Sequence, residues 1–171
     1  MVDKEDILEE PAIRIYLLRL IGEDGLELLR RFPQDKEYSD EELAEKTGIN
    51  LNTVRHTLYT LYEKRLAEYR RIKNAETGWL TYLWSLNLDR IYDTIREDMR
   101  LILEKLEARE RFEEENDFFM CPDCGRFTFN EVSDLGFICP RCGQEVEHFE
   151  NEMLLRALKK RTTAIRECLG H

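Results

Sequence analysis

The sequence contains two cysteine motifs of the same form. They read Cys121-Pro-Asp-Cys124-Gly and Cys139-Pro-Arg-Cys142-Gly, with fourteen residues between them. Two residues between paired thiolates let both sulfurs reach one tetrahedral ion, and four thiolates close its coordination shell. The glycine after each second cysteine permits a tight turn that directs backbone N–H groups at the sulfurs. The motifs therefore predict one structural Zn²⁺ ion, with Cys121, Cys124, Cys139 and Cys142 as its ligands.

Two other interpretations of these cysteines stay open. An iron site of the rubredoxin kind uses similar motifs, although such chains usually separate them further. A pair of disulfides would need an oxidising compartment, and nothing in the chain indicates export. His148 is close to the second motif, but four cysteines already satisfy the ion. The fifth cysteine, Cys168, lies in a C-terminal amphipathic segment and is interpreted as a packed or half-exposed thiol.

Residues suited to catalysis are scarce in the rest of the chain. The three histidines, His56, His148 and His171, have no serine or cysteine near them in the sequence context of a nucleophile. The chain has no glycine-rich phosphate loop and no His-x-x-x-His pair for catalytic zinc. The carboxylates of residues 107–115 are more simply a solvated helix face than a metal site. We therefore expect that the protein is not an enzyme.

The composition limits the classes of partner. The formal net charge of −10 over 171 residues argues against a protein that coats nucleic acid by charge alone. Residues 49–86 are the one basic stretch in the first two thirds of the chain, because they carry six basic and three acidic side chains; residues 150–171 have a net charge of +2. No apolar run approaches the ~20 residues of a membrane span, and no signal peptide is visible, so a cytoplasmic location is expected.

The first half of the chain has the hydrophobic pattern of helices. Residues 8–21 and 26–32 are predicted to be two helices, and Ser39 with Glu42 fits a capping box that begins a third, which ends at Gly48. A fourth helix is expected over residues 52–64. Its predicted inner face consists of Val54, Leu58, Leu61 and Tyr62.

The period of the pattern then changes from 3.6 to 2. Residues 69–73 and 79–86 are predicted to be the strands of a hairpin. The side chains expected to face the core are Leu80, Tyr82, Trp84 and Leu86. This order of elements is that of a winged helix, with the helix-turn-helix at 39–66 and the wing at 67–86. An unrelated small α+β domain with the same order is the alternative.

The second half begins with a long charged helix over residues 87–115. An apolar seam, with spacings of three and four, is formed by Leu88, Tyr92, Ile95, Met99, Ile102 and Leu106. The acidic residues after Leu106 are expected to be solvated or frayed. Residues 153–169 carry a matching stripe, so the two helices could pair; otherwise the seam packs on the winged helix or on a partner.

A zinc ribbon is predicted for residues 118–149. Phe127, Phe129, Val132 and the 136–138 stretch suggest two short strands between the cysteine motifs, with a turn at 133–136. So small a module cannot bury enough surface to fold alone, and zinc ligation, worth ~10–16 kcal/mol in comparable peptides, would supply the difference.

Together these segments predict a mainly α protein with small β elements. We expect a winged helix-turn-helix domain at residues 1–86, a charged helical linker at 87–117, the zinc ribbon at 118–149 and an amphipathic helix at 150–171.

The residues predicted to contact nucleic acid or a polymerase lie on the fourth helix and the wing. They are Arg55, Lys64, Arg65, Tyr69, Arg70, Arg71, Lys73 and Trp79. Only Arg55 is a strong base-reading side chain on the exposed face of the helix. Cationic groups beside an exposed aromatic near the hairpin tip suit unpaired DNA, where a base can stack. Alternatively, Trp79 packs on the hairpin and the arginines are solvated.

The order of these modules resembles archaeal transcription factor E, which is similar to the N-terminal half of the large subunit of eukaryotic transcription factor IIE. The resemblance extends from about Ile7 to Phe149. It implies a basal initiation factor that joins RNA polymerase, the TATA-binding protein and transcription factor B, lies near the polymerase clamp and stalk, and favours the open promoter complex. It also implies zinc on the four cysteines, a wing tip at Asn74–Tyr82 with Trp79 as its aromatic residue, and in some members a second, smaller subunit.

The competing hypothesis is a sequence-specific, dimeric winged-helix regulator with a structural or metal-sensing zinc module. The seam from Leu88 to Leu106 could then be its dimer interface, and its binding site would be a two-fold symmetric duplex. A redox-active ribbon protein is a third interpretation.

Overall fold

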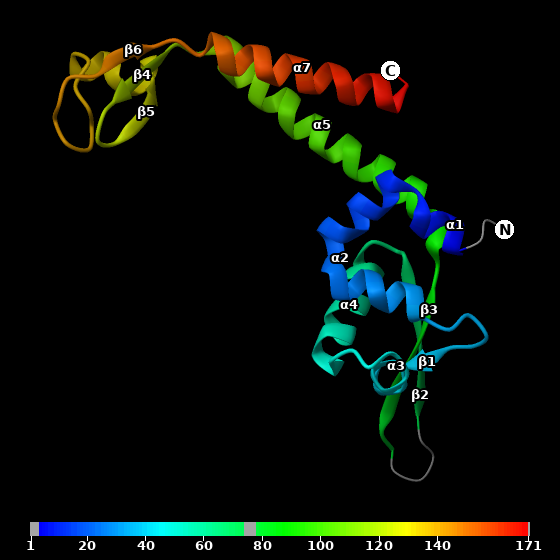
Figure 1. Ribbon diagram of the computed structural model, residues 1–171. Helices are drawn as coiled ribbons and strands as arrows, with labels where there is room; N and C mark the ends of the chain where they lie inside the picture. Colours follow the sequence, from blue (N-terminus) through cyan, green and yellow to red (C-terminus); the bar gives the residue numbers. More distant parts are fainter. Residues whose placement is uncertain (1–3, 74–77, 171) are drawn as a thin grey trace. The chain divides into compact units, whose positions relative to one another are not determined.

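The computed structural model describes residues 4–73 and 78–170. The chain divides into two compact units, Met1–Ile95 and Arg96–His171, which are described separately. Helices dominate both units and each contains one small three-stranded sheet, which confirms the predicted fold class (Figure 1). Within the described residues, no helix combines the length and the apolarity that a membrane crossing requires.

The N-terminal unit begins with helices α1 (Lys4–Glu9) and α2 (Pro11–Arg31). The predicted helix over 8–21 is wrong at its start, because the chain breaks at Glu10 and Pro11 opens a new helix, where its missing N–H costs no hydrogen bond. Gly22 interrupts α2 with φ 71° and ψ −177°, close to the predicted break. The helical residues therefore extend further than the two predicted segments.

Helix α3 (Asp40–Thr47) begins at the predicted capping box. The Ser39 Oγ accepts the Glu42 N–H at 3.1 Å, and the Glu42 carboxylate accepts the Ser39 N–H at 2.9 Å. The helix ends where Gly48, at φ 72°, donates its N–H to the Ala44 carbonyl. Helix α4 (Leu51–Glu63) follows, with the Asn50 side chain accepting the Asn52 N–H.

The capping box gives a direct test of this unit. Ser39→Ala is expected to lower the free energy of unfolding by about 1 kcal/mol, because the Glu42 N–H loses the Ser39 Oγ as its acceptor. Both tryptophans, Trp79 and Trp84, lie in this unit, so urea unfolding can be followed by tryptophan fluorescence. Ser39→Asp keeps a capping oxygen and should cost less; an equal cost for both variants would contradict the role of the cap.

The predicted inner face of α4 is confirmed for three of its four residues. Val54, Leu58 and Leu61 are fully buried, but Tyr62 is exposed. Its ring lies at the edge of the helix face and packs 4.9 Å from the ring of Tyr69. The core also takes residues from α1, α2, β3 and the start of α5, among them Ile7, Leu17, Leu28, Trp84 and Ile91.

The sheet of this unit has the strand order β1-β3-β2. Strands β2 (Ala67–Lys73) and β3 (Leu80–Leu86) form the predicted hairpin, with Tyr69 opposite Trp84 and Lys73 opposite Leu80. Strand β1 (Tyr38–Ser39) was not predicted, because two residues are too few to show a period. Trp84 is 2% exposed, as expected for the core face, whereas Leu80 is exposed near the hairpin tip, which corrects the prediction for that residue.

The long helix begins with a 3-10 turn (Leu88–Arg90) and continues as α5 (Ile91–Glu115). The predicted seam is wrong at Tyr92 and Ile102, which are exposed, while Leu103 is buried. After Met99, the next residue of the buried stripe is therefore Leu103, four positions on, and not Ile102, three positions on, as predicted. Both spacings follow the helical period, so the sequence alone could not choose between them.

The C-terminal unit corrects the predicted hairpin between the cysteine motifs. Strands β4 (Phe118–Cys121), β5 (Gly125–Thr128) and β6 (Glu147–Phe149) form a sheet in the order β5-β4-β6, so the first motif is the turn between β4 and β5. Between the motifs only β5, which contains Phe127, is a strand; it is followed by helix α6 (Phe129–Val132) and a 3-10 turn (Ser133–Leu135) in place of the second strand. A capping box of Thr128 and Glu131 begins that helix and overrides the aromatic strand pattern.

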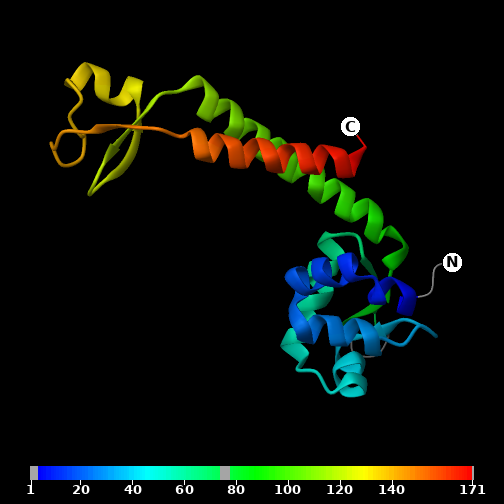
Figure 2. The same cartoon turned by 45° about the horizontal axis from the view of Figure 1, so that its top comes forward.

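Helix α7 (Glu152–Leu169) lies along the C-terminal half of α5 in both views (Figures 1 and 2). Lys159 pairs with Glu114 at 2.6 Å, and the Thr162 hydroxyl donates to Glu110 at 2.9 Å. The acidic end of α5 is therefore helical and not frayed, while all of residues 107–115 except Glu113 keep some exposure, so of the two predicted alternatives the solvated one holds. Two of the arrangements left open for the seam occur. Leu88 and Ile95 pack with the core of the N-terminal unit, and further along α5 the two helices pair, with Leu158 and Thr162 buried on α7.

Candidate metal centre and nucleic-acid interface

The four motif cysteines converge on one point. One possible ligand atom from each of Cys121, Cys124, Cys139 and Cys142 lies within 4.8 Å of all the others, and the sulfurs of Cys121 and Cys142 are 3.5 Å apart. A tetrahedron with Zn–S bonds of ~2.3 Å has edges of about 3.8 Å, so the cluster has the size of a metal site. These residues could hold a metal ion, and all five cysteines of the chain are free thiols.

The glycines of both motifs adopt left-handed backbone conformations. Gly125 has φ 101° and Gly143 has φ 78°, which a residue with a Cβ rarely adopts. Around the second motif, Gly143 donates its N–H to the Cys139 carbonyl at 2.9 Å, and Cys139 donates to the Gln144 carbonyl at 2.7 Å. The turn geometry predicted from the sequence is thus present in both motifs.

The thiols of the cluster differ in acidity because they lie so close together. Burial raises the pKa of Cys139, but backbone N–H groups of Cys142 and Arg141 outweigh it and lower the pKa to about 7. The hydrogen bond with Cys142, followed by burial, raises the pKa of Cys124 to about 12. Four adjacent thiols cannot all ionise without a positive charge between them, and a divalent ion supplies that charge.

His148 and Cys168, which the sequence analysis did not assign as ligands, lie outside the four-cysteine cluster. The His148 ring packs edge-on against Phe119 with a centroid distance of 5.5 Å. Cys168 is exposed on α7.

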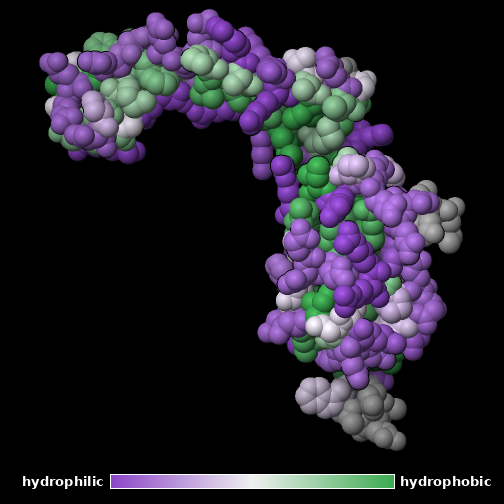
Figure 3. Space-filling model, in the orientation of Figure 1, coloured by the Kyte–Doolittle hydropathy of each residue, from purple (hydrophilic) through white to green (hydrophobic). Residues whose placement is uncertain are grey.

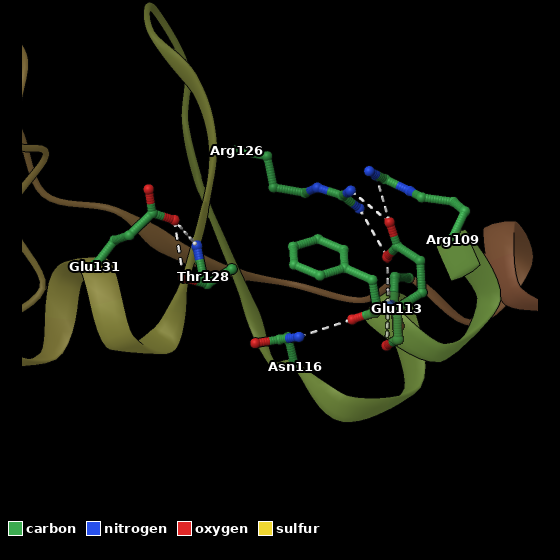
Figure 4. Close-up of polar contacts among 8 residues, drawn as sticks. Arg109, Glu113, Asn116, Arg126, Thr128 and Glu131 are labelled. Carbon is green, nitrogen blue, oxygen red and sulfur yellow. Dashed lines mark hydrogen bonds and ion pairs between the residues drawn. The ribbon is translucent and has the colours of Figure 1, made fainter. Parts of the chain in front are cut away.

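A buried carboxylate joins the cysteine module to α5. The Glu113 side chain is fully buried and accepts hydrogen bonds from Arg126 at 2.6 and 3.1 Å, with Arg109 2.5 Å away (Figure 4). Asn151 donates to the same carboxylate at 2.7 Å, and the Arg126 guanidinium lies 4.1 Å from the centre of the Phe118 ring. Sequence reasoning missed Glu113, because it is one acidic residue among many in this segment.

These contacts keep Glu113 ionised. Burial alone would raise the pKa of Glu113. The hydrogen bonds from Arg126 and Asn151, with the charges of Arg126 and Arg109, lower it by more than burial raises it. The pKa of Glu113 therefore lies below its ordinary value of 4.5. The carboxylate is therefore a permanent negative charge at the junction of α5, β5 and the start of α7.

Several of the predicted contact residues are engaged within the N-terminal unit. Arg55 pairs with Asp40 and, at 2.7 Å, with Glu41, so the one base-reading side chain of α4 is held by α3. Arg70 pairs with Glu37 at 2.5 Å. Surface ion pairs of this kind are worth about 1 kcal/mol or less each, so Arg70 must break one such pair and Arg55 two before either reaches another anion.

The wing carries its aromatic residues in two different places. Tyr69 was expected, with Trp79, to bring an aromatic ring close to the hairpin tip; instead it packs in a cluster with Tyr62, Tyr82 and Trp84. Arg71 lies over the rings of Tyr69 and Tyr82, at 5.7 and 5.8 Å from their centroids. This correction follows from the hairpin register, which places Tyr69 deep in the sheet.

Trp79 is the aromatic residue of the tip. It is 78% exposed and directly precedes β3, while residues 74–77, part of the predicted tip, lie outside the described residues. Lys73 is exposed at the end of β2, Lys64 ends α4, and Arg65 follows with φ 59°. The predicted contact set is therefore divided: Lys73 and Trp79 flank the tip, and Lys64 and Arg65 lie at the end of α4 near the base of the wing.

Known proteins are similar to this chain over nearly its whole length. The family model described as TFIIE alpha subunit matches residues 11–115. A protein named Transcription factor E from Methanoregula boonei is 61% identical over 98% of this chain and 97% of its own length. Proteins of the same name from Methanospirillum hungatei and Methanocorpusculum labreanum are 58% and 44% identical, over 100% and 98% of this chain and 99% and 97% of their own lengths.

Proposed function

The chain belongs to the transcription factor E family of transcription initiation factors, and we propose that it promotes or stabilises promoter opening near the upstream edge of the melted DNA. Initiation factors of this kind act by binding DNA and other proteins. The chain belongs to a family of transcription factors, not to a class of enzymes.

The observation that carries this proposal is the exposure of Trp79. An indole that is 78% exposed offers a face on which an unpaired base can stack, and Lys73, whose register partner Leu80 follows Trp79, adds a positive charge at the same end of the hairpin. Each stacked base is worth ~1–3 kcal/mol, which is enough to shift a closed promoter toward the open form.

The proposed partners are the RNA polymerase clamp and stalk, the TATA-binding protein and transcription factor B, with promoter DNA bound weakly or without sequence preference. The pairing of Arg55 with Asp40 and Glu41 supports weak base reading, because a side chain held by two carboxylates must break both contacts to reach a base. A factor of this kind is held in its complex mainly by proteins. A second, smaller subunit is a further candidate partner.

We also propose that the cysteine cluster binds one structural Zn²⁺ ion. Four thiolates from paired motifs are a donor set that zinc prefers, and they leave no open position for a substrate. The ion would stabilise the fold of residues 118–149, with Cys121, Cys124, Cys139 and Cys142 as its ligands.

A promoter-opening assay tests the proposed function. Purified archaeal RNA polymerase, TATA-binding protein and transcription factor B are assembled on a weak promoter, and the permanganate reactivity of its thymines is measured with and without the chain. Addition of the wild-type chain should raise the reactivity. Trp79→Ala is expected to lower the gain about tenfold, because one stacked base is lost.

Ile72→Ala is the matched control for this variant, since it removes another exposed apolar side chain from the same hairpin. It should behave as the wild type. Equal reactivity with Trp79→Ala and the wild type would count against the stacking role. No effect of the wild type, together with selective binding to a palindromic duplex, would favour the dimeric regulator instead.

A further inference from the structure

Four aromatic rings gather at the surface of the cysteine module. The Phe119 centroid lies 4.9 Å from that of Phe137, 5.5 Å from that of His148 and 6.3 Å from that of Phe129. Phe129 and Phe137 are 5.9 Å apart, and they are 44% and 38% exposed. We call Phe119, Phe129, Phe137 and His148 the ribbon aromatic cluster; Figure 3 shows hydrophobic surface between hydrophilic atoms on this module.

The backbone of Phe137 indicates that its exposed ring has a use. Its φ of 61° lies in the left-handed region, which a bulky side chain occupies only under strain. Phe137 is held there by its N–H, which donates to the Val132 carbonyl at 2.9 Å, and by its carbonyl, which accepts from Val146 at 3.0 Å. Glycine would fit this conformation without strain. Strained residues concentrate at functional sites, so an exposed phenylalanine here points to recognition.

The charges of the module define what can approach the cluster. Residues 118–149 contain five acidic residues, all exposed: Asp123, Glu131, Asp134, Glu145 and Glu147. Both arginines of the segment are engaged: Arg126 pairs with Glu113, and Arg141 donates to the Cys124 carbonyl and lies over the Phe127 ring. This excess of negative charge repels phosphates and attracts cationic side chains.

We infer that the ribbon aromatic cluster is a docking surface for a basic segment of a partner protein, one that carries arginine or lysine beside aliphatic side chains. Exposed phenylalanine faces attract guanidinium groups, and apolar side chains cover the rest of the rings. The inference depends on the proposed function in one respect: the partner protein is expected to be a component of the transcription initiation complex. It adds to that function a second attachment point, separate from the wing.

The chemistry of the surface is tested without any polymerase. Full-length, metal-loaded protein is titrated with a peptide of alternating arginine and leucine, and with glutamate–leucine peptide of equal length as the control, while amide and aromatic NMR signals are recorded. Shifts at Phe119, Phe129 and Phe137 with the basic peptide alone are expected. No shifts there, equal shifts with the acidic peptide, or larger shifts with single-stranded DNA would overturn the inference.

The importance of the surface is tested by Phe137→Gly. This variant removes the ring and relieves the backbone, so the melting temperature should stay within a few degrees of the wild type, while affinity for purified RNA polymerase falls about tenfold or more. Met153→Ser is the matched control, because it removes an apolar side chain that is 83% exposed on α7. Phe137→Tyr should restore the affinity.

Unchanged affinity of Phe137→Gly for polymerase would overturn the inference even if the wild type opens promoters, and the proposed function would then stand alone. If the wild type neither binds polymerase nor opens promoters, the proposed function fails, and the peptide titration decides the docking chemistry by itself.

Discussion

Removal of the metal ion with a chelator is expected to unfold residues 118–149 and to leave the N-terminal unit folded. The buried cluster of the cysteine module contains only Cys121, Phe127, Val132, Cys139 and Val146, and two of these five are proposed ligands. Such a core cannot offset the chain entropy of the module, whereas zinc ligation contributes ~10–16 kcal/mol in comparable peptides. Loss of the amide NMR dispersion of residues 118–149 measures the unfolding.

Two cysteine variants separate ligation from other effects of the chelator. Cys139→Ser should abolish stoichiometric zinc, measured by atomic absorption, because three thiolates leave the shell incomplete. Cys168→Ser is the matched control and should retain one ion per chain, since Cys168 is exposed outside the cluster. Tryptophan fluorescence should be unchanged in both, because Trp79 and Trp84 lie in the other unit. Full zinc content in Cys139→Ser would contradict the ligand assignment.

Glu113→Gln is expected to lower the free energy of unfolding of the C-terminal unit by about 3 kcal/mol. The carboxamide keeps the shape of the side chain but leaves the largely buried Arg126 guanidinium without its counter-charge. Chemical denaturation of the metal-loaded chain, followed by circular dichroism, measures the loss. Glu104→Gln, which changes an exposed carboxylate on the same helix, should cost less than ~0.5 kcal/mol.

The pH dependence of this cost follows from the lowered pKa of Glu113. A depressed carboxyl pKa contributes stability that is present above the unfolded pKa of ~4.3 and is lost as the pH falls through the folded pKa. The cost of Glu113→Gln should therefore be constant between about pH 6 and about pH 8. A cost that changes across this range, or a double variant with Arg126→Met whose cost is the sum of the two singles, would argue against the ion pair as the cause.

The features that sequence reasoning found are local ones. The Ser39–Glu42 capping box and the turn at Gly48 depend on residues a few positions apart, and the cysteine cluster depends on two short motifs with known ligand chemistry. Each of these features is caused by residues that are only a few positions apart in the sequence. Such signals are readable because no distant partner is needed to form them.

The features that sequence reasoning missed depend on distant partners or on competing local signals. Thr128 and Glu131 form the same capping box as Ser39 and Glu42, but the aromatic residues around them suggested strands. Glu113 acquires its role only when Arg126 and Asn151 are brought to it by the fold. The exposure of Trp79 also could not be deduced, because packing on the hairpin and projection from it have the same sequence pattern.

The pairing of α7 with α5 is expected to depend on the ionic strength of the solution. The Lys159–Glu114 and Arg166–Glu107 pairs are both partly exposed, so high salt weakens them. Few apolar side chains of α7 are buried in that contact: Leu158, which is 7% exposed, is the one buried apolar residue of this helix within the described chain. Rising ionic strength is therefore expected to loosen the contact of the terminal helix with α5.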